Sequence, residues 1–345
     1  MHWSKMKGVL AERFPSRVLT IDSHTAGEPT RLIVGGIPPL PGKTMQAKLD
    51  YFRANLDSIR LLLTSEPRGH RDMLAAAVTE PTTEGADFGL IYMDARRYPF
   101  LCGHATIGAV TTLIEAGALP AKVAEAVVTV DTPSGPMRTR AQIKADKVDS
   151  VAIQMVPSFV YGADQTLRVP GIGTILVDTV CVGGFFVMVS ADQIGMELTL
   201  ANAKQLVQLG MAIIDNANDQ LEVRHPMRPE VTTIDVVEFY DPSGHAQKSG
   251  KNIVVYGEAH MDRSPCGTGT AAKMTLLHHR KQLAIAQPFI NANPLGPTFE
   301  GRIAFETKVG ELPAIVGEVC GSAHITGIHE FVLDPDDPFP QGFLV

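Results

Sequence analysis

The chain has 345 residues, which is longer than a single hydrophobic core usually grows, so we expect two domains. Hydrophobic residues make up 45% of it and charged residues 19%, a composition typical of soluble globular proteins. The formal net charge is -7 and the basic residues are scattered, which argues against a nucleic-acid partner and against binding to an anionic membrane.

Strand-like segments dominate the chain. They are short runs rich in Val, Ile, Thr and aromatic residues, bounded by turn residues. In chain order we expect strands at residues 18–22, 31–34, 88–93, 126–131, 151–156, 174–181, 185–190, 232–240, 252–256 and 304–307. Helical periodicity is rarer. We expect helices at residues 44–63, 105–118, 198–214 and 269–283.

Two of these helices follow a Cys-Gly pair. The first tract reads Leu-Cys-Gly-His-Ala-Thr-Ile-Gly and contains Cys102; the second reads Ser-Pro-Cys-Gly-Thr-Gly-Thr and contains Cys266. Each follows a strand and a polar loop, and the two cysteines lie roughly half the chain length apart. Small residues in both helices would allow strands to pack closely around them. The pattern predicts a unit that occurs twice.

A repeated unit of this kind predicts an α+β fold with two pseudo-symmetric domains, each a mostly antiparallel sheet wrapped around a central helix. Pro and Gly residues between 156 and 164 suggest the boundary. We expect residues 1–160, joined by the C-terminal segment 325–345, to form the half that carries Cys102. Residues 161–324 would form the half that carries Cys266, and the active site would lie in the cleft between the halves.

A thiol at the start of a helix is stabilised as a thiolate by unpaired N–H groups and by the helix dipole, which bring its pKa to about 3.5–7.5. Two such thiols facing one substrate would take an α-proton from one face of an amino acid and return a proton to the other. Backbone N–H groups at both helix starts, those of Gly103, His104, Gly267 and Thr268, would bind the substrate carboxylate. The predicted chemistry is therefore two-base inversion at an α-carbon.

Other interpretations of the cysteines are weaker. A zinc site needs four ligands, usually in close pairs, and Cys266 has no such neighbour. A cysteine acyl-transfer enzyme needs one thiol paired with a His, which leaves the second thiol unexplained. Cys181 and Cys320 lie in Val-containing strands without a partner motif, so we expect both to be ordinary buried residues.

Several further polar residues have two interpretations. Asp262, four residues before Cys266, either accepts a hydrogen bond from a substrate nitrogen or caps the loop. His104 either faces the pocket or caps its helix. His24, Glu28 and His70 stand in turn-like segments, where a structural role is the simpler expectation.

The compartment follows from the termini and the cysteines. The first residues contain no secretion signal, and the longest apolar run, residues 174–191, is interrupted by Asp178 and is too short to span a bilayer. Four cysteines without CxxC spacing indicate reduced thiols. We expect a cytoplasmic protein with no membrane partner.

The motifs together resemble those of the proline racemase family, which includes proline racemases, 4-hydroxyproline 2-epimerases and trans-3-hydroxyproline dehydratases. The resemblance runs nearly end to end and is most specific around Cys266. It is carried by Asp22-Ser-His-Thr-Ala-Gly-Glu28, Glu66-Pro-Arg-Gly-His70, Cys102-Gly-His104, Asp131-Thr-Pro, Gly183-Gly-Phe, Asp262-Arg-Ser-Pro-Cys-Gly-Thr-Gly269 and Asp337-Pro-Phe.

The resemblance implies a fold shared with diaminopimelate epimerases, consistent with the two predicted domains. It implies that Cys102 and Cys266 are the catalytic thiols and that Asp262 lies in the pocket. Its carboxylate-binding amides fall on Gly103, His104, Gly267 and Thr268. It also implies an amino-acid substrate, no metal, no pyridoxal phosphate or other cofactor, and a homodimer.

Within the family, members that dehydrate 3-hydroxyproline typically carry Thr in place of the second Cys, so Cys266 favours racemisation or epimerisation. Positions that shape the ring pocket hold Leu74, Tyr256 and Phe185, and the Tyr256 hydroxyl would suit a ring hydroxyl. Both proline and 4-hydroxyproline remain open as substrates. The alternatives are a 3-hydroxyproline dehydratase, and a non-catalytic amino-acid-binding or dithiol redox protein on the same fold.

Overall fold

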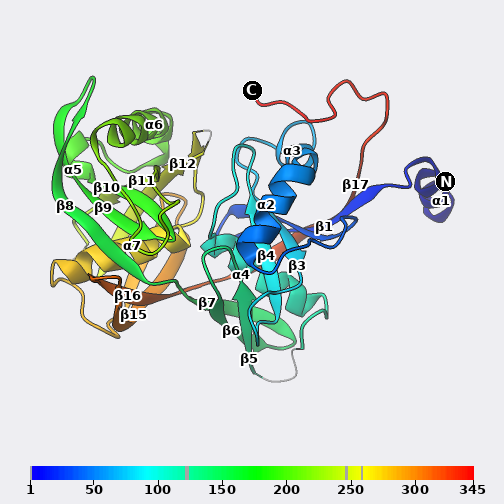
Figure 1. The fold of residues 1–345 in the computed structure, drawn as a ribbon, viewed down its shortest axis with the longest axis horizontal. Helices are drawn as coiled ribbons and strands as arrows, with labels where there is room; N and C mark the ends of the chain where they lie inside the picture. The colour runs from blue at the N-terminus through cyan, green and yellow to red at the C-terminus, as the bar shows by residue number, and fades with distance from the viewer. Residues whose placement is uncertain (1, 121–123, 245–247, 258) are drawn as a thin grey trace.

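The computed structural model describes residues 2–120, 124–244, 248–257 and 259–345. They form a strand-rich α+β fold with two halves side by side (Figure 1). The predicted fold class is therefore confirmed.

One continuous, mostly antiparallel sheet runs through both halves. Its strands are β1 (Arg17–Thr25), β2 (Glu28–Gly35), β3 (Ala75–Thr79), β4 (Phe88–Met93), β5 (Glu125–Asp131), β6 (Met137–Lys144), β7 (Lys147–Gln154), β8 (Ser158–Val169), β9 (Gly173–Val182), β10 (Gly184–Ser190), β11 (Ile234–Asp241), β12 (Ser249–Tyr256), β13 (His260–Met261), β14 (Phe289–Ala292), β15 (Thr298–Val309), β16 (Leu312–Gly321) and β17 (Ala323–Val332).

The helices are fewer. They are α1 (Trp3–Arg13), α2 (Met45–Asn55), α3 (Asp57–Thr64), α4 (Gly103–Glu115), α5 (Ala191–Ile194), α6 (Ala203–Gln220) and α7 (Gly267–His279), with a 3-10 turn at Leu200–Asn202. Figure 1 shows α4 among β1 to β7 in one half and α7 beside β8, β15 and β16 in the other.

Strand pairing connects the two halves. β7 pairs antiparallel with β16, which carries the sheet from one half into the other. The chain then returns: β17 pairs antiparallel with β1, and residue Phe343 forms a bridge with Glu66. The C-terminal segment thus packs against the N-terminal half. The stretch 156–164, where we expected a boundary, lies largely in β8, which pairs with β9 over its whole length.

The two central helices are buried almost completely. Every residue of α4 from Gly103 to Ile114 is buried, and α7 is buried from Gly269 to Leu277. Small residues make this possible: a Cβ added at Gly108 would lie 2.9 Å from the Ser23 hydroxyl on β1. Because both helices are buried on all faces, each one is enclosed by strands of the sheet that wrap around it.

One predicted helix was wrong in its extent. Residues 44–63 form two helices, because Leu56 leaves the helical conformation at φ -128° and ψ 15°. The second helix begins at Asp57, whose carboxylate pairs with Arg60, and Arg60 donates to the carbonyls of Asp94 and Ala95. This tertiary anchoring of α3 to the loop after β4 has no counterpart in the helical periodicity.

Other elements were absent from the prediction. The strands β3, β6, β8, β13, β14, β16 and β17 and the helices α1 and α5 were not expected. Several of these strands mix polar and charged residues with apolar ones; β6, for example, reads Met-Arg-Thr-Arg-Ala-Gln-Ile-Lys. Their backbone hydrogen bonds to paired strands, which are adjacent in the chain for β6 and distant for β17, make them strands more than their own composition does.

The two central helices meet at their starts. A Cβ on Gly103 would lie 3.0 Å from the Cα of Gly267, and a Cβ on Gly267 would lie 3.1 Å from the Cα of Gly103. Only a residue without a side chain permits this approach, so the glycine after each cysteine sets how closely the helix starts come together.

We predict that Gly267→Ala lowers the free energy of unfolding by about 1–3 kcal/mol, because the added methyl group must push two backbones apart. Urea denaturation measures this change. The control is Gly8→Ala, at an exposed helical position where an added Cβ meets nothing within 4 Å, and it should leave stability equal or slightly raised. Equal stability of Gly267→Ala and wild type would contradict the close contact.

Candidate active site

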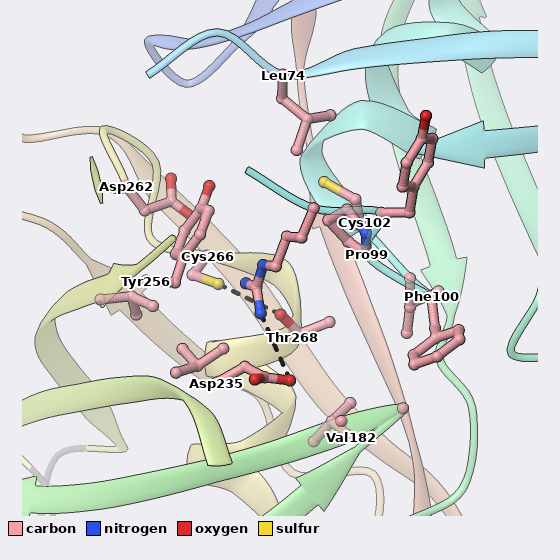
Figure 2. A pocket seen from close by; sticks show the side chains of 18 of the residues that line it. Leu74, Pro99, Phe100, Cys102, Val182, Asp235, Tyr256, Asp262, Cys266 and Thr268 are labelled. Carbon is pink, nitrogen blue, oxygen red and sulfur yellow. Dashed lines mark hydrogen bonds and ion pairs between the residues drawn. The ribbon is translucent and has the colours of Figure 1, made fainter. Parts of the chain in front are cut away.

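A cavity of about 540 Å³ lies where the two helix starts meet. Every site residue expected from the sequence lines it, and Figure 2 shows residues of both halves pointing into it. These residues are Cys102, Gly103, His104, Tyr256, Asp262, Cys266, Gly267 and Thr268. Leu74 and Phe185, which with Tyr256 are the positions expected to shape a ring pocket, also line it.

Cys102 precedes the first turn of α4 with an ordinary extended backbone, φ -146° and ψ 112°. Its Sγ atom lies 3.3 Å from Nδ1 of His104, so the imidazole faces the thiol instead of capping the helix. Burial lowers the pKa of His104 to about 4, and the ring also donates to the Pro29 carbonyl. A neutral imidazole therefore contacts this thiol at pH 7.

Cys266 precedes α7 in a different conformation, with φ 60° and ψ 117°. Its Sγ atom accepts a hydrogen bond from the Gly269 N–H at 3.3 Å and lies 3.4 Å from the Thr268 hydroxyl, a contact drawn as a dashed line in Figure 2. Both thiols are nearly buried, with 8% of Cys102 and 7% of Cys266 exposed.

The thiol pKa values differ from the sequence-based expectation. Burial raises the pKa of Cys102, and the carboxylates of Asp262 and Glu28 raise it further. Burial and Asp262 likewise raise the pKa of Cys266, against the opposing hydrogen bonds from Thr268 and Gly269. The expectation of a thiolate at neutral pH was wrong for this cavity, because removal from water disfavours the charged form more than a helix start favours it.

The two carboxylate oxygens of Asp262 have different surroundings, and only the loop-capping role that the sequence left open is seen directly. One carboxylate oxygen accepts hydrogen bonds of 2.7 Å from the backbone N–H and the hydroxyl of Ser264, which shapes the loop before Cys266. The other, Oδ2, is buried and has no hydrogen-bond partner within the described residues. Burial, followed by the charge of Glu28, raises the pKa of Asp262. A donor entering the cavity would satisfy this oxygen.

Tyr256 stacks on His260 with ring centroids 4.4 Å apart, and its hydroxyl lies 3.4 Å from the His260 Nε2 atom. The same nitrogen lies 2.7 Å from the Oε1 atom of Glu28. Although burial lowers it, the pKa of His260 is raised overall because Glu28 stabilises the charged ring. Glu28 also accepts from the Arg263 N–H at 2.6 Å, so it joins the two halves behind the cavity.

Three polar residues from the sequence motifs lie outside the cavity lining. Glu28 is buried behind it, as described. His24 accepts from the Gly27 N–H at 3.2 Å, and His70 accepts from the Asp72 N–H at 3.2 Å. The histidines therefore stabilise turns, as their context suggested.

A charged rim was missed by the sequence analysis. Arg97, on the loop before Cys102, has Nη1 3.5 Å from Asp235 on β11 and its guanidinium carbon 5.5 Å from the centre of the Tyr256 ring. This ion pair joins the halves across the cavity. The position of Arg97 in the loop before Cys102 could have indicated that it lies near the cavity. Nothing in the sequence near Asp235 indicated that it pairs with Arg97.

Across residues 2–120, 124–244, 248–257 and 259–345, no three His, Cys, Asp or Glu side chains are grouped as a metal site would require. Within the same ranges, no helix has the length and apolar character needed to cross a membrane.

The fold and the cavity define a two-half α+β protein in which each half contributes one thiol at a helix start. The family model described as proline racemase matches residues 20–344 of the chain. The chain therefore belongs to the proline racemase family, as its motifs indicated.

Its relatives include a proline racemase of Clostridioides difficile, 40% identical over 333 residues, which cover 96% of this chain and 99% of that protein. A 4-hydroxyproline 2-epimerase of Streptosporangium roseum is 39% identical, over 94% of this chain and 97% of its own. A crystal structure of a hydroxyproline epimerase from Agrobacterium vitis with bound trans-4-hydroxy-L-proline superposes with a TM-score of 0.91 at 28% identity, covering 96% of both chains.

We predict that Asp262→Asn lowers the pKa of both thiols, because it removes a negative charge that disfavours the thiolates. At a given pH a larger fraction of each thiol is then ionised, so the rise of iodoacetamide alkylation with pH moves to lower pH. Peptide mass spectrometry measures the profile for each thiol.

The matched control for this measurement is Asp235→Asn. Asp235 lines the same cavity, but its side chain is 45% exposed and pairs with Arg97, so solvent screens its charge. Its removal should leave both alkylation profiles nearly in place. An unmoved profile in Asp262→Asn, or a shift to higher pH, would contradict the electrostatic assignment.

Proposed function

We propose that the protein is a cofactor-independent racemase or epimerase that inverts the α-carbon of proline or 4-hydroxyproline. The observation that carries the proposal is the convergence of two thiols, Cys102 and Cys266, from two helix starts on one cavity. The relatives named proline racemase and 4-hydroxyproline 2-epimerase support the same reaction type.

In this proposal the two thiols act as a pair. The thiolate of one cysteine takes the α-proton, forming an S–H bond while the C–H electron pair stays on the α-carbon. The thiol of the other cysteine gives its proton to the opposite face, which completes inversion and leaves that sulfur as the thiolate. The enzyme is then poised for the reverse direction, and no oxidant or reductant is consumed.

The rest of the cavity suits the charges of an amino acid. The free Oδ2 of Asp262 would accept a hydrogen bond from the ring ammonium group. N–H groups in the first turns of α4 and α7 have no partner within their helices, so those of Gly103, His104, Gly267 and Thr268 would bind the carboxylate. Charge that develops on the carboxylate as the proton leaves is stabilised by these donors.

The raised thiol pKa values fit a cavity that is activated by its substrate. Asp262 disfavours both thiolates as long as its charge is uncompensated. An ammonium group beside Asp262 would compensate that charge and lower the pKa of the thiols. Proton abstraction would then be possible only when a substrate amine is in place.

The lining supports a small ring as the substrate. Leu74 and Phe185 offer apolar contact. Tyr256 offers a hydroxyl, which lies 3.4 Å from the Nε2 atom of His260. A polar group at this point suits the 4-hydroxyl of hydroxyproline. The apolar contacts would also suit proline, which has no ring hydroxyl. Both substrates should therefore be tested.

We further propose that the enzyme acts in the cytoplasm as a homodimer. All four cysteines are free, which agrees with a reducing compartment. For the dimer, β17 pairs with β1 along one edge and presents Ile328, 80% exposed, and Ile325, 38% exposed, at the surface. Apolar side chains on a sheet edge are suited to being covered by a second chain.

We predict that Cys102→Ser and Cys266→Ser each reduce inversion by at least about 10²-fold, because a hydroxyl is a poor base and one face of the substrate is left unserved. Polarimetry measures inversion. Cys181→Ser is the matched control: this thiol is buried on β9 and is not among the residues that line the cavity, so its replacement should leave the rate nearly unchanged. Near wild-type inversion in either cavity variant would refute the two-base assignment.

The substrate is tested with L-proline, trans-4-hydroxy-L-proline and trans-3-hydroxy-L-proline in parallel in D2O. Inversion with deuterium at the α-carbon identifies a racemase or an epimerase and its preferred ring. Formation of a Δ1-pyrroline product from the 3-hydroxy compound identifies a dehydratase instead. Binding of all three without any turnover would leave the non-catalytic alternative.

A further inference from the structure

The backbone at Cys266 has a conformation that side-chain-bearing residues rarely adopt. Its φ of 60° is combined with a ψ of 117°, outside the regions that are comfortable for an L-residue. Such a conformation costs of order 1–3 kcal/mol and persists only where surrounding contacts enforce it. Cys102, in the corresponding place of the other half, has an ordinary extended backbone. Something specific to the C-terminal half must therefore hold Cys266.

The peptide group before Cys266 is fixed at its carbonyl end. The Pro265 carbonyl oxygen accepts from the Asn252 side-chain amide at 2.9 Å and from the Asn291 side-chain amide at 3.2 Å. The Thr270 hydroxyl adds a third contact at 3.3 Å. Both asparagines are 1% exposed, so water does not compete for these bonds. One backbone oxygen is thus held by donors from β12, β14 and α7.

The same peptide group is also fixed at its N–H end. The Cys266 N–H donates to the Ser264 hydroxyl oxygen at 3.0 Å, and that hydroxyl donates to Asp262 at 2.7 Å. On the far side of the residue, the Cys266 carbonyl accepts from the Thr270 N–H at 2.8 Å and starts the helix. With the peptide plane held on one side and the helix on the other, rotation about the N–Cα bond of Cys266 is set.

A buried carboxyl group orients the first of the two amides. Glu238 on β11 is fully buried and accepts from the Asn252 amide at 3.0 Å, so that amide has acceptors, Glu238 and the Pro265 carbonyl, on both N–H bonds. Glu238 can approach because Gly269 has no side chain: a Cβ there would lie 2.8 Å from the Glu238 Oε2 atom. The Thr270 hydroxyl accepts from the second amide, that of Asn291, at 3.0 Å.

We propose that Asn252 and Asn291 are positioning residues for Cys266: together they hold the Pro265 carbonyl so that the thiol enters the cavity at the angle needed for proton transfer, and Glu238 orients Asn252. The inference rests on the proposed function for its catalytic consequence. We call the two amide hydrogen bonds from Asn252 and Asn291 to the Pro265 carbonyl the clamp. Without the clamp, the Pro265–Cys266 peptide relaxes to an ordinary conformation and the sulfur turns away from its Gly269 N–H donor. Cys102, which needs no such clamp, is unaffected.

The test compares Asn252→Ala and Asn291→Ala with a matched control, Asn218→Ala. Asn218 is also an asparagine that ties two elements by side-chain amide bonds, at 2.7 Å to the Ile234 carbonyl and 3.0 Å to the Ile214 carbonyl, but it lies on α6 outside the cavity lining. Each variant is first checked for folding by circular dichroism and thermal denaturation. The control reports what general loosening of the same half does.

Two measurements are made on each variant. In the first, inversion kinetics should show kcat reduced by about 10- to 100-fold with KM changed by less than about threefold, since the substrate contacts remain while a reacting atom is misplaced. In the second, iodoacetamide alkylation should slow several-fold at Cys266 while Cys102 keeps its rate, because Cys266 loses a hydrogen bond that stabilises its thiolate. The thiols are followed on separate tryptic peptides.

Two variants of Glu238 test whether it orients Asn252. Glu238→Gln keeps an acceptor oxygen for Asn252 and should retain most of the kcat, whereas Glu238→Ala lacks it and should reproduce the selective slowing at Cys266. This pair also covers the case in which an asparagine variant fails to fold. Equal kcat values and equal alkylation rates at Cys266 in Glu238→Gln and Glu238→Ala would show that Glu238 does not orient Asn252.

Three outcomes would overturn the positioning role: equal slowing of both thiols, no change at Cys266, or the same selective loss in Asn218→Ala. Failure of the proposed function is a different result, namely wild-type protein that inverts none of the three ring substrates. In that case the alkylation measurement still decides whether the clamp holds Cys266, because it needs no substrate.

Discussion

The contact between Gly103 and Gly267 is the constraint on which the rest of the structure depends. Each central helix is enclosed by the strands of its own half of the sheet, and the two helices meet at their starts. Two glycines without side chains let the backbones come within about a van der Waals contact there. The residue before each glycine is a cysteine, and both thiols are thereby delivered to the walls of a single cavity.

The electrostatics of that cavity follow from its enclosure. Burial raises the pKa of the thiols and of Asp262 and lowers the pKa of His104 to about 4, so each of these groups is biased toward its neutral form. A helix start favours a thiolate, yet the buried carboxylates of Asp262 and Glu28 disfavour it at Cys102, and that of Asp262 disfavours it at Cys266. The balance makes the ionisation of the thiols responsive to whatever charge enters the cavity.

The two halves are alike in layout but not in detail. Cys102 has a regular backbone and a neutral imidazole beside its sulfur, whereas Cys266 has a left-handed φ held by three donors on the preceding carbonyl. A reaction that runs in both directions needs two thiols of similar reactivity. The surroundings of the two thiols differ, and the clamp that we propose in the C-terminal half would compensate for that difference at Cys266.

From the sequence alone, the α+β class, the strand at Phe88–Met93, the helices after the two cysteines and every expected lining residue of the cavity were identified, because hydrophobic period and the Cys-Gly repeat are local signals. Only the tertiary structure decided the break at Leu56, the Arg97–Asp235 pair across the cavity, the raised thiol pKa values and the hold of Asn252 on Pro265. Each of these depends on burial or on contacts between segments far apart in the chain. Burial and long-range contacts do not change the local residue pattern, so a sequence pattern cannot predict them.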